Sequence, residues 1–338
     1  MKKIFYLILL LLIVFSTVVL WRIFGPTISN PTEKYLYIKT ESDFNSLTQK
    51  LADEEFTNNI FGFKQVSKHF KFTTVKPGKY LIKNGTSIFN LVRMLKNGTQ
   101  DPVRLVIPKL RTKEALAQLI SKHFEIDSIA MIQFLIDESN AQTNYGTKQE
   151  LLLTYVLPNT YFVYWNESPK IIFDKFYAHS QKFWNEERRN KAAAINLSQQ
   201  QVYILASIID EESNFEKEKG MIASVYLNRL KLKMPLQADP TIKYALNNFL
   251  LKRIMQKHLT VNSPYNTYKN KGLPPGPICI AQASTINAIL NAPKTNYLYF
   301  VANVDFSQTH LFSSNYQAHI VKAKKYQQAL NKLMNNDK

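Results

Sequence analysis

The sequence predicts an α+β protein in three parts: a single N-terminal transmembrane helix, a small α+β module, and a larger mixed α+β domain that carries an acidic residue on a helix. Three observations predict this organisation. Residues 4–21 form an apolar run that is broken only by Ser16 and Thr17. Strand-like and helix-like segments follow without an internal repeat. A helix-spaced apolar pattern that starts at Ser198 ends in a carboxylate, Glu212.

The apolar run nearly spans a hydrocarbon core, at about 1.5 Å of rise per helical residue. Lys2 and Lys3 precede it, which favours a cytoplasmic N-terminus and places the rest of the chain outside the inner face of the membrane. A cleaved signal peptide is the alternative, but the run is long for one and no small-x-small cleavage site follows. Trp21 and Arg22 are instead typical of an interfacial anchor. We therefore expect an uncleaved single-pass anchor over residues 1–24 in the inner (cytoplasmic) membrane, with the following domains extracytoplasmic or periplasmic.

The chain has 338 residues and a formal net charge of +18. Its lysines are scattered, without an arginine-rich run or a nucleic-acid-binding motif, so we expect no nucleic-acid partner; anionic lipid headgroups or an acidic polymer fit the charge at least as well. The six histidines are dispersed, and Cys279 is the single cysteine, so neither a metal cluster nor an internal disulfide is expected. No phosphate-binding glycine loop or serine nucleophile elbow is present, and we expect no cofactor.

The first segments after the anchor are expected to be a linker and a small α+β lead-in. Prolines and Asn30 predict a linker over residues 25–34. Alternating apolar residues predict a strand over 35–39, and a cap at Ser42–Asp43 predicts a helix to about residue 51.

Residues 76–125 are expected to form a strand-helix-strand-helix module of about the size of the glycan-binding LysM domain. The expected elements are a strand at 79–82, a helix capped by Thr86 that stops at Gly98, a strand at 103–107 and a helix capped by Thr112. The expected domains are residues 1–24 for the anchor, 25–75 for the linker and lead-in, 76–125 for the LysM-like module, 126–195 for a helical connection and 196–338 for the last domain.

Helices dominate the rest of the chain. The expected elements are helices beginning at Asp127 and at Ser168–Pro169, a polar loop at 140–146, helices at 216–233 and 284–290, a strand at 297–301 paired with 310–312, and an amphipathic helix at 316–334.

The main chemical signal lies on the helix that ends near residue 212. Ser198 and Gln201 form a capping box that predicts its start. The apolar residues that share one face at about 100° per step are Val202, Leu205, Ile208 and Ile209. Glu212 continues that face. A carboxyl group turned toward an interior or a cleft has a raised pKa and stays protonated near neutral pH, as a general acid requires. The pattern leaves open that Glu212 is solvated at the last turn.

Rigid, non-helical stretches flank this helix and the next in sequence: residues 234–241, 262–268 and 272–277. Tyr265 and Tyr268 offer flat faces for a sugar ring. Gln237, Asp239 and Asn266 offer directional donors and acceptors for hydroxyl and acetamido groups. The alternative is structural, with Asp239 as a helix cap and the prolines as stiff connectors. One acid aimed into a cleft among sugar-type ligands indicates cleavage of a glycosidic bond.

The second half of the chain resembles the catalytic domain of the endolytic murein transglycosylases in six ordered blocks: residues 206–213, 223–230, 234–241, 265–268, 272–278 and 297–301. Residues 157–162 resemble the family's lead-in to that domain, and the anchor and LysM-like module also fit. The resemblance implies a membrane-anchored lytic transglycosylase that cleaves nascent peptidoglycan strands internally, between N-acetylmuramic acid and N-acetylglucosamine, and terminates strand elongation. It implies glycan strands, the membrane and peptidoglycan synthases as partners, and no cofactor.

The resemblance assigns the catalytic role to Glu212, which the helical phase also favours. The substrate-binding residues that it implies are Ser213, Asn228, Arg229, Gln237, Asp239, Thr241, Tyr265, Asn266, Thr267 and Tyr268. In the implied mechanism, Glu212 protonates the glycosidic oxygen and then accepts the proton of the sugar's own C6 hydroxyl, which attacks C1 to leave a 1,6-anhydromuramoyl end.

The sequence departs from the family pattern at three places outside the Glu212 block. Asn159 stands where the family usually has Asp, residues 280–282 replace an asparagine-proline-glycine-like run, and Arg111 stands where a glycine and an aromatic residue are common. These departures bear on fine substrate preference or have no effect.

Two alternatives remain at this point. In the first, the protein is a membrane-anchored glycan-binding scaffold of the cell-wall synthesis machinery, in which Glu212 is structural. In the second, water is the acceptor, which predicts a reducing sugar end and a second carboxylate near the cleft, for which Asp239 is the candidate.

Overall fold

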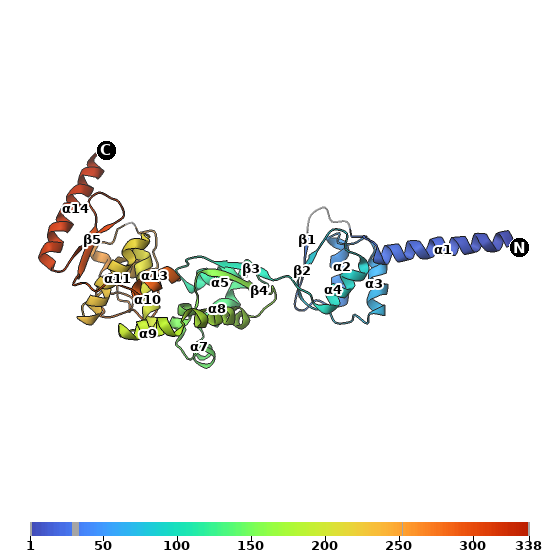
Figure 1. Cartoon of the computed structure of the whole chain (residues 1–338), viewed down its shortest axis with the longest axis horizontal. Helices are drawn as coiled ribbons and strands as arrows, with labels where there is room; N and C mark the ends of the chain where they lie inside the picture. Colours follow the sequence, from blue (N-terminus) through green and yellow to red (C-terminus); the bar gives the residue numbers. More distant parts are fainter. Residues whose placement is uncertain (1, 29–33, 252, 337–338) are drawn as a thin grey trace. The chain divides into compact units, whose positions relative to one another are not determined.

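The computed structural model describes residues 2–28, 34–251 and 253–336 (Figure 1). The chain divides into two compact units. The first comprises Met1–Leu105, Ile120–Asp127 and Phe162–Ser168, and the second comprises Val106–Leu119, Ser128–Tyr161 and Pro169–Lys338. The chain therefore crosses between the units several times, and neither unit coincides with a domain predicted from the sequence.

The first unit begins with the apolar helix α1 (Lys2–Phe24), which has a mean hydropathy of 2.8 and no buried residue over its most apolar window. By length and composition it could cross a membrane, as a single-pass anchor or as a signal sequence. After residues 29–33, which lie outside the described part, β1 (Lys34–Ile38) pairs antiparallel with β2 (Gly78–Ile82). The helices α2 (Phe44–Asp53), α3 (Ile60–His69) and α4 (Ile88–Asn97) complete this unit.

Residues 25–28 of the predicted linker have no regular secondary structure, and Ile28 among them is buried in the core of this unit. Its backbone bonds to the turn before α4: Ile28 N donates to Thr86 O (3.1 Å) and Gly85 N donates to Ile28 O (2.9 Å). The cap of α4 differs from the prediction. Ser87 caps the helix by accepting from Asn90 N, while the Thr86 hydroxyl donates to Lys83 O within the turn.

The elements of the predicted LysM-like module lie in different sheets. Strand β2 pairs with β1, whereas β3 (Val103–Ile107) pairs with β4 (Asn159–Val163). The sequence predicts β1, β2 and β3 closely but not β4, and the pattern of one strand does not say which other strand supplies its partner. The LysM-like character and the predicted domain boundaries therefore stay predictions.

The second unit is built around one central helix. Its elements are α5 (Lys113–Ser121), whose last two residues belong to the first unit, α6 (Ser128–Ile136), α7 (Glu138–Tyr145), η1 (Gln149–Tyr155), α8 (Pro169–Phe183), α9 (Glu186–Ala194), α10 (Gln199–Glu212), α11 (Glu216–Lys231), α12 (Asp239–Ala245), η2 (Gln256–His258), α13 (Ala283–Leu290), β5 (Tyr299–Ala302), β6 (His310–Ser313) and α14 (Tyr316–Asn336). The polar loop predicted at 140–146 is instead α7, because Asp137 caps its start and Gly146 takes the left-handed conformation at its end. β5 and β6 pair antiparallel, close to the prediction.

Helix α10 is the core of this unit (Figure 1). The predicted capping box of Ser198 and Gln201 is confirmed. The nine consecutive residues from Val202 to Asp210 are all buried, because α9, α11, α12, α13 and η1 pack around the helix. A helix that is buried on every side has no single core-facing stripe, so the phase of its apolar residues does not determine where Glu212 points.

Candidate active site

Three consecutive acidic residues end α10, and each has a different environment. Asp210 is the most buried, with 3% of its surface exposed. Its Oδ1 accepts from Lys219 Nζ (2.8 Å) and from Thr285 Oγ1 (2.5 Å), and its Oδ2 accepts from Gln282 N (2.7 Å). Both oxygens are occupied and the charge is paired with a buried cation, so Asp210 joins α10 to α11 and α13.

Glu211 points to the strand-to-helix segment after β3. Its carboxylate pairs with Lys109 Nζ (2.8 Å) and with Arg111 Nη2 (2.9 Å). Lys109 Nζ also donates to Asp210 O (2.6 Å), so this pair ties the segment to the last turn of α10. Both contacts of Glu211 are with the segment after β3, so its carboxylate serves to join that segment to α10.

Glu212 has a neutral partner. Tyr226 Oη, from α11, donates to Glu212 Oε1 (2.8 Å), and within the described residues no Lys, Arg or His forms an ion pair with this carboxyl. The pKa of Glu212 is raised to about 7: burial is the main cause, the Tyr226 hydrogen bond opposes the rise, the nearby Asp239 charge adds to it, and the charges of Lys243 and Arg229 oppose it. A substantial fraction of Glu212 is therefore protonated at neutral pH.

Glu212 lies in the wall of three hollows. The first, of 320 Å³, has Tyr226, Arg229, Asp239 and Tyr268 in its wall. The second, also of 320 Å³, runs past Ser213 to the β5–β6 turn, and the third, of 490 Å³, is lined by residues of α12 and α14. Hollows that share one carboxyl group can hold an extended, polar ligand on both sides of that group.

Four of the predicted binding residues line the first hollow with Glu212: Arg229, Gln237, Asp239 and Tyr268. Asp239 Oδ1 accepts from Tyr268 Oη (2.5 Å). Arg229 Nε donates to Leu298 O (2.7 Å), which joins α11 to the chain before β5. Ser213 lies in the second hollow, where its hydroxyl accepts from Phe215 N (3.0 Å).

The other five predicted binding residues are not among those that line these hollows, and their side chains fix loops. Asn228 Nδ2 donates to Thr295 O (3.0 Å) and Tyr297 O (2.9 Å). Asn266 is fully buried and donates to Leu259 O and Val261 O. The remaining three are Thr241 and Thr267, which bond to each other (2.8 Å), and Tyr265, which packs on Tyr244 (ring centroids 4.6 Å apart).

Sequence reasoning missed several residues of the first hollow: Tyr226, Tyr299, Phe300, Tyr316 and His319. The His319 ring stacks on Tyr299, with centroids 5.2 Å apart and 23° between the planes. Burial, then the charges of Arg229 and Lys322, lower the pKa of His319 and favour its neutral form. Tyr226, Tyr299 and Phe300 lie inside two of the six blocks of resemblance, 223–230 and 297–301, which are the signal that could have found them. Tyr316 and His319 come from a helix that the sequence marks only as lysine-rich and amphipathic.

The three departures from the family pattern also have defined places. Arg111 pairs with Glu211. Ile280 is fully buried, and the backbone of Ala281 and Gln282 donates to Tyr203 Oη (3.0 Å) and to Asp210, so residues 280–282 support α10. The Asn159 amide lies 3.0 Å from a ring nitrogen of His179.

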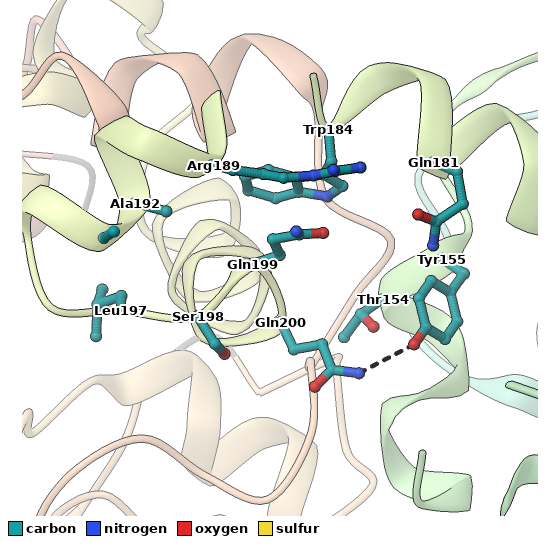
Figure 2. Close-up of a pocket in the computed structure, with 11 residues that line it drawn as sticks. Thr154, Tyr155, Gln181, Trp184, Arg189, Ala192, Leu197, Ser198, Gln199 and Gln200 are labelled. Carbon is teal, nitrogen blue, oxygen red and sulfur yellow. Dashed lines mark hydrogen bonds between the residues drawn. The ribbon is translucent and has the colours of Figure 1, made fainter. Parts of the chain in front are cut away.

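Another cavity in the second unit, of 380 Å³, lies at the opposite end of α10. Figure 2 shows amide, hydroxyl, indole and guanidinium groups around it, with Gln200 Nε2 donating to Tyr155 Oη (3.1 Å). None of the described residues that line this cavity carries a carboxyl group. Acid catalysis therefore points to the hollows around Glu212. Among the residues that the structure describes, no three His, Cys, Asp or Glu side chains gather in a way that could hold a metal ion.

Residues 36–325 match the model of the YceG-like family. The endolytic murein transglycosylase of Bacillus subtilis (strain 168) is 28% identical over 306 residues, which cover 83% of each chain. The protein of the same name from Streptococcus pneumoniae (strain ATCC BAA-255 / R6) is 28% identical over 292 residues, and the matched region covers 77% of this chain and 52% of the relative. Among solved structures, a yceG-like protein from Listeria monocytogenes matches with a TM-score of 0.56 and 28% identity, over 86% of this chain and 99% of that one.

Proposed function

The chain belongs to the YceG-like family and is a lytic transglycosylase, and from this premise we propose that Glu212 is its general acid. The observation that carries the proposal is a half-buried carboxyl group with a neutral hydrogen-bond partner, Tyr226, in the wall of three hollows. The substrate is the glycan strand of nascent peptidoglycan, cut internally between N-acetylmuramic acid and N-acetylglucosamine.

The reaction needs one carboxyl group. Protonated Glu212 gives its proton to the glycosidic oxygen as the bond from that oxygen to C1 of muramic acid breaks, through an oxocarbenium-like transition state. The Glu212 carboxylate then takes the proton of the C6 hydroxyl, whose oxygen forms a bond to C1. The products are a 1,6-anhydromuramic acid end and a free hydroxyl on N-acetylglucosamine. Glu212 is protonated again, and no water is consumed.

Tyr226 positions this acid. Its hydroxyl is a neutral donor, so it holds Glu212 Oε1 in place without trapping the carboxyl in its ionised form, as a cation would. When Glu212 has lost its proton, the same hydrogen bond and the charges of Arg229 and Lys243 stabilise the carboxylate.

The sugar contacts come from the walls of the first hollow. The rings of Tyr299 and Tyr316 offer apolar faces for pyranose rings, and Gln237 and Asp239 offer polar groups for hydroxyl and acetamido groups. The other five residues act on the substrate through the backbone that they hold in place: Asn228 in α11, Thr241 in α12, and Tyr265, Asn266 and Thr267 in a loop.

Hydrolysis is the second candidate, because Asp239 supplies a second carboxylate in the same hollow. One of its oxygens is already bonded to Tyr268, which favours a role in shaping the hollow over activation of water. A non-catalytic glycan-binding scaffold explains less, since it has no use for a half-buried carboxyl group without a counter-charge.

The proposed location of the protein in the cell follows from α1. We place the chain in the inner membrane as a single-pass protein, with Lys2 and Lys3 on the cytoplasmic side and the second unit outside the cytoplasm. There the enzyme meets strands as they are made, so that internal cleavage terminates their elongation, and peptidoglycan synthases are its natural neighbours.

Mass spectrometry of uncrosslinked glycan strands tests the proposal. The full chain in detergent micelles is incubated with the strands beside the Glu212→Gln variant. Internal fragments with anhydromuramic acid ends, absent with the variant, are expected. Fragments with reducing ends would support hydrolysis, and the Asp239→Asn variant would then be inactive. Uncut strands that co-sediment with both proteins would establish the scaffold.

A further inference from the structure

Helix α1 is built into the first unit. Its residue Ile23 packs against the buried core of that unit, and the ring of Phe24 lies 5.0 Å from the ring of Phe89 on α4. Asn59 Nδ2, at the start of α3, donates to Arg22 O (3.3 Å). The buried Ile28 follows only four residues after the helix ends. The end of the apolar helix and the folded unit are therefore one body, with no flexible spacer in the described residues between them (Figure 1).

The outer face of α3 carries an unusual side chain for a water-exposed surface. Phe61 is 75% exposed, a larger fraction than that of any large apolar side chain of α1 itself. It lies two residues after Asn59, and so beside the end of α1. Lys64 and Lys68 follow at helical spacing on the same exposed face. The inner face of α3 is buried, so this arrangement is fixed.

Helix α4, next to α3, also contributes an aromatic and a basic side chain. Phe89 links Phe24 to Phe70, the residue at the end of α3, with ring centroids 5.0 and 5.2 Å apart. The guanidinium of Arg93 lies 5.9 Å from the Phe89 ring. Aromatic rings mixed with cations at the end of an apolar helix are typical of the boundary between hydrocarbon and headgroups. We name as the collar the residues Phe24, Phe61, Lys64, Lys68, Phe89 and Arg93.

We propose that the collar is a membrane-docking surface, on which Phe61 enters the interfacial layer of the bilayer that α1 crosses while Lys64 and Lys68 contact anionic phospholipid headgroups. This inference rests on the proposed membrane-spanning role of α1. The fixed junction brings the first residues of α3 to the surface wherever α1 inserts, and the charges of Lys64 and Lys68 complement an anionic surface. The first unit would then lie against the membrane instead of standing away from it on a tether.

Spin-label depth measurements on the full chain in nanodiscs test the geometry. Labels are placed in Phe61→Cys, in Phe15→Cys within α1, and in Glu41→Cys, an exposed site after β1 of the same unit. Cys279 is fully buried, and the unsubstituted protein gives its labelling background. With phosphatidylcholine and phosphatidylglycerol discs, the ratio of oxygen to nickel-chelate accessibility at position 61 should exceed that at 41 at least twofold and lie below that at 15.

Equal ratios at positions 61 and 41, with a high ratio at 15, would overturn the docking surface while leaving the anchor intact. A low ratio at position 15 as well would show that α1 does not insert, and both proposals would fall. Neither result depends on the enzymatic activity, which is measured separately on glycan strands.

Charge reversal tests the headgroup contact. The ratio at position 61 should rise as the share of phosphatidylglycerol increases, and Lys64→Glu/Lys68→Glu should abolish this rise. The matched control is Lys39→Glu/Lys122→Glu, which makes the same charge change at exposed sites elsewhere in the first unit. An equal loss in both double variants, or no lipid dependence in the unsubstituted collar, would overturn the electrostatic contact.

Discussion

Asp210 and Glu212 lie two residues apart at the end of α10, and both carboxyl groups are withdrawn from bulk water, yet their surroundings differ. Asp210 faces a buried ammonium, a hydroxyl and a backbone N–H. Glu212 faces one phenol. A buried carboxylate that is paired with a cation serves the fold, whereas one that is left with a neutral donor keeps its proton near pH 7. Burial alone would have selected Asp210 and not Glu212, which we propose as the acid.

The largest predicted effect is the loss of turnover when Glu212 is substituted. Glu212→Gln keeps the shape of the side chain but removes the proton that is transferred, and general acid catalysis is worth about 10²- to 10⁴-fold. We expect turnover of glycan strands to fall by at least about 10³-fold, measured by release of anhydromuramic ends. Far-ultraviolet circular dichroism and strand co-sedimentation should match the unsubstituted protein; a loss of folded structure would contradict the assignment.

Breaking the ion pair between Asp210 and Lys219 should lower the free energy of unfolding. Lys219→Met leaves Asp210 buried without its counter-charge, which costs about 3–5 kcal/mol for a buried pair. Chemical denaturation of the second unit should report this loss.

The control for that variant is Asp210→Asn/Lys219→Met, which removes both charges. It should recover most of the stability, because replacing a whole buried pair is close to neutral. If the single and double variants were equally destabilised, steric packing and not charge would account for the role of Lys219.

The raised pKa of Glu212 should also couple the stability of the fold to pH. The pKa of Glu212 is about 7 in the folded state against an ordinary value of 4.5, so between these values the folded state binds the proton more tightly than the unfolded state does. Stability from this group is therefore fully present below pH 4.5 and is lost as the pH rises to about 7. The difference corresponds to at most about 3 kcal/mol.

Thermal unfolding of Glu212→Gln beside the unsubstituted protein measures this coupling. The variant should gain stability relative to the unsubstituted protein as the pH rises from 4.5 to 7, with no further gain above that range. A constant difference across the range would mean that Glu212 titrates normally and is not set up as an acid.

Much of this contrast was visible in the sequence. The capping box at Ser198 and the order of the blocks predict the helix and its neighbours, since these signals are local. The partners of the acids were not predictable. Asp210 accepts hydrogen bonds from Lys219 Nζ, Thr285 Oγ1 and the backbone N–H of Gln282, which come from three different segments. The periodicity of apolar residues in the sequence does not predict which side chains from distant segments come into contact.

The same reason explains why the sequence placed Tyr265 and Asn266 at the substrate and overlooked His319. Aromatic and amide side chains in a rigid loop have the right chemistry to bind sugars. Here, however, the Asn266 side-chain amide donates its hydrogen bonds to Leu259 O and Val261 O. His319 has no motif around it, and only the packing of α14 on β5 brings it to the wall of the first hollow. The sequence therefore predicts which chemistry is present more reliably than which of its carriers reach the cavity.

The smallest loss of turnover is expected from Tyr226→Phe, which removes the hydrogen bond from the Tyr226 hydroxyl to Glu212. Its hydrogen bond lowers the pKa of Glu212, so without it the pKa rises and the alkaline limb of the pH–rate profile moves upward. The carboxylate formed in the reaction also loses a donor, worth about 1.5–3 kcal/mol, so turnover should fall roughly 10- to 100-fold. A phenol that acted only by filling space would leave the limb where it is, because Phe fills the same space. The rate and the pH profile together therefore separate a positioning role for Tyr226 from a structural one.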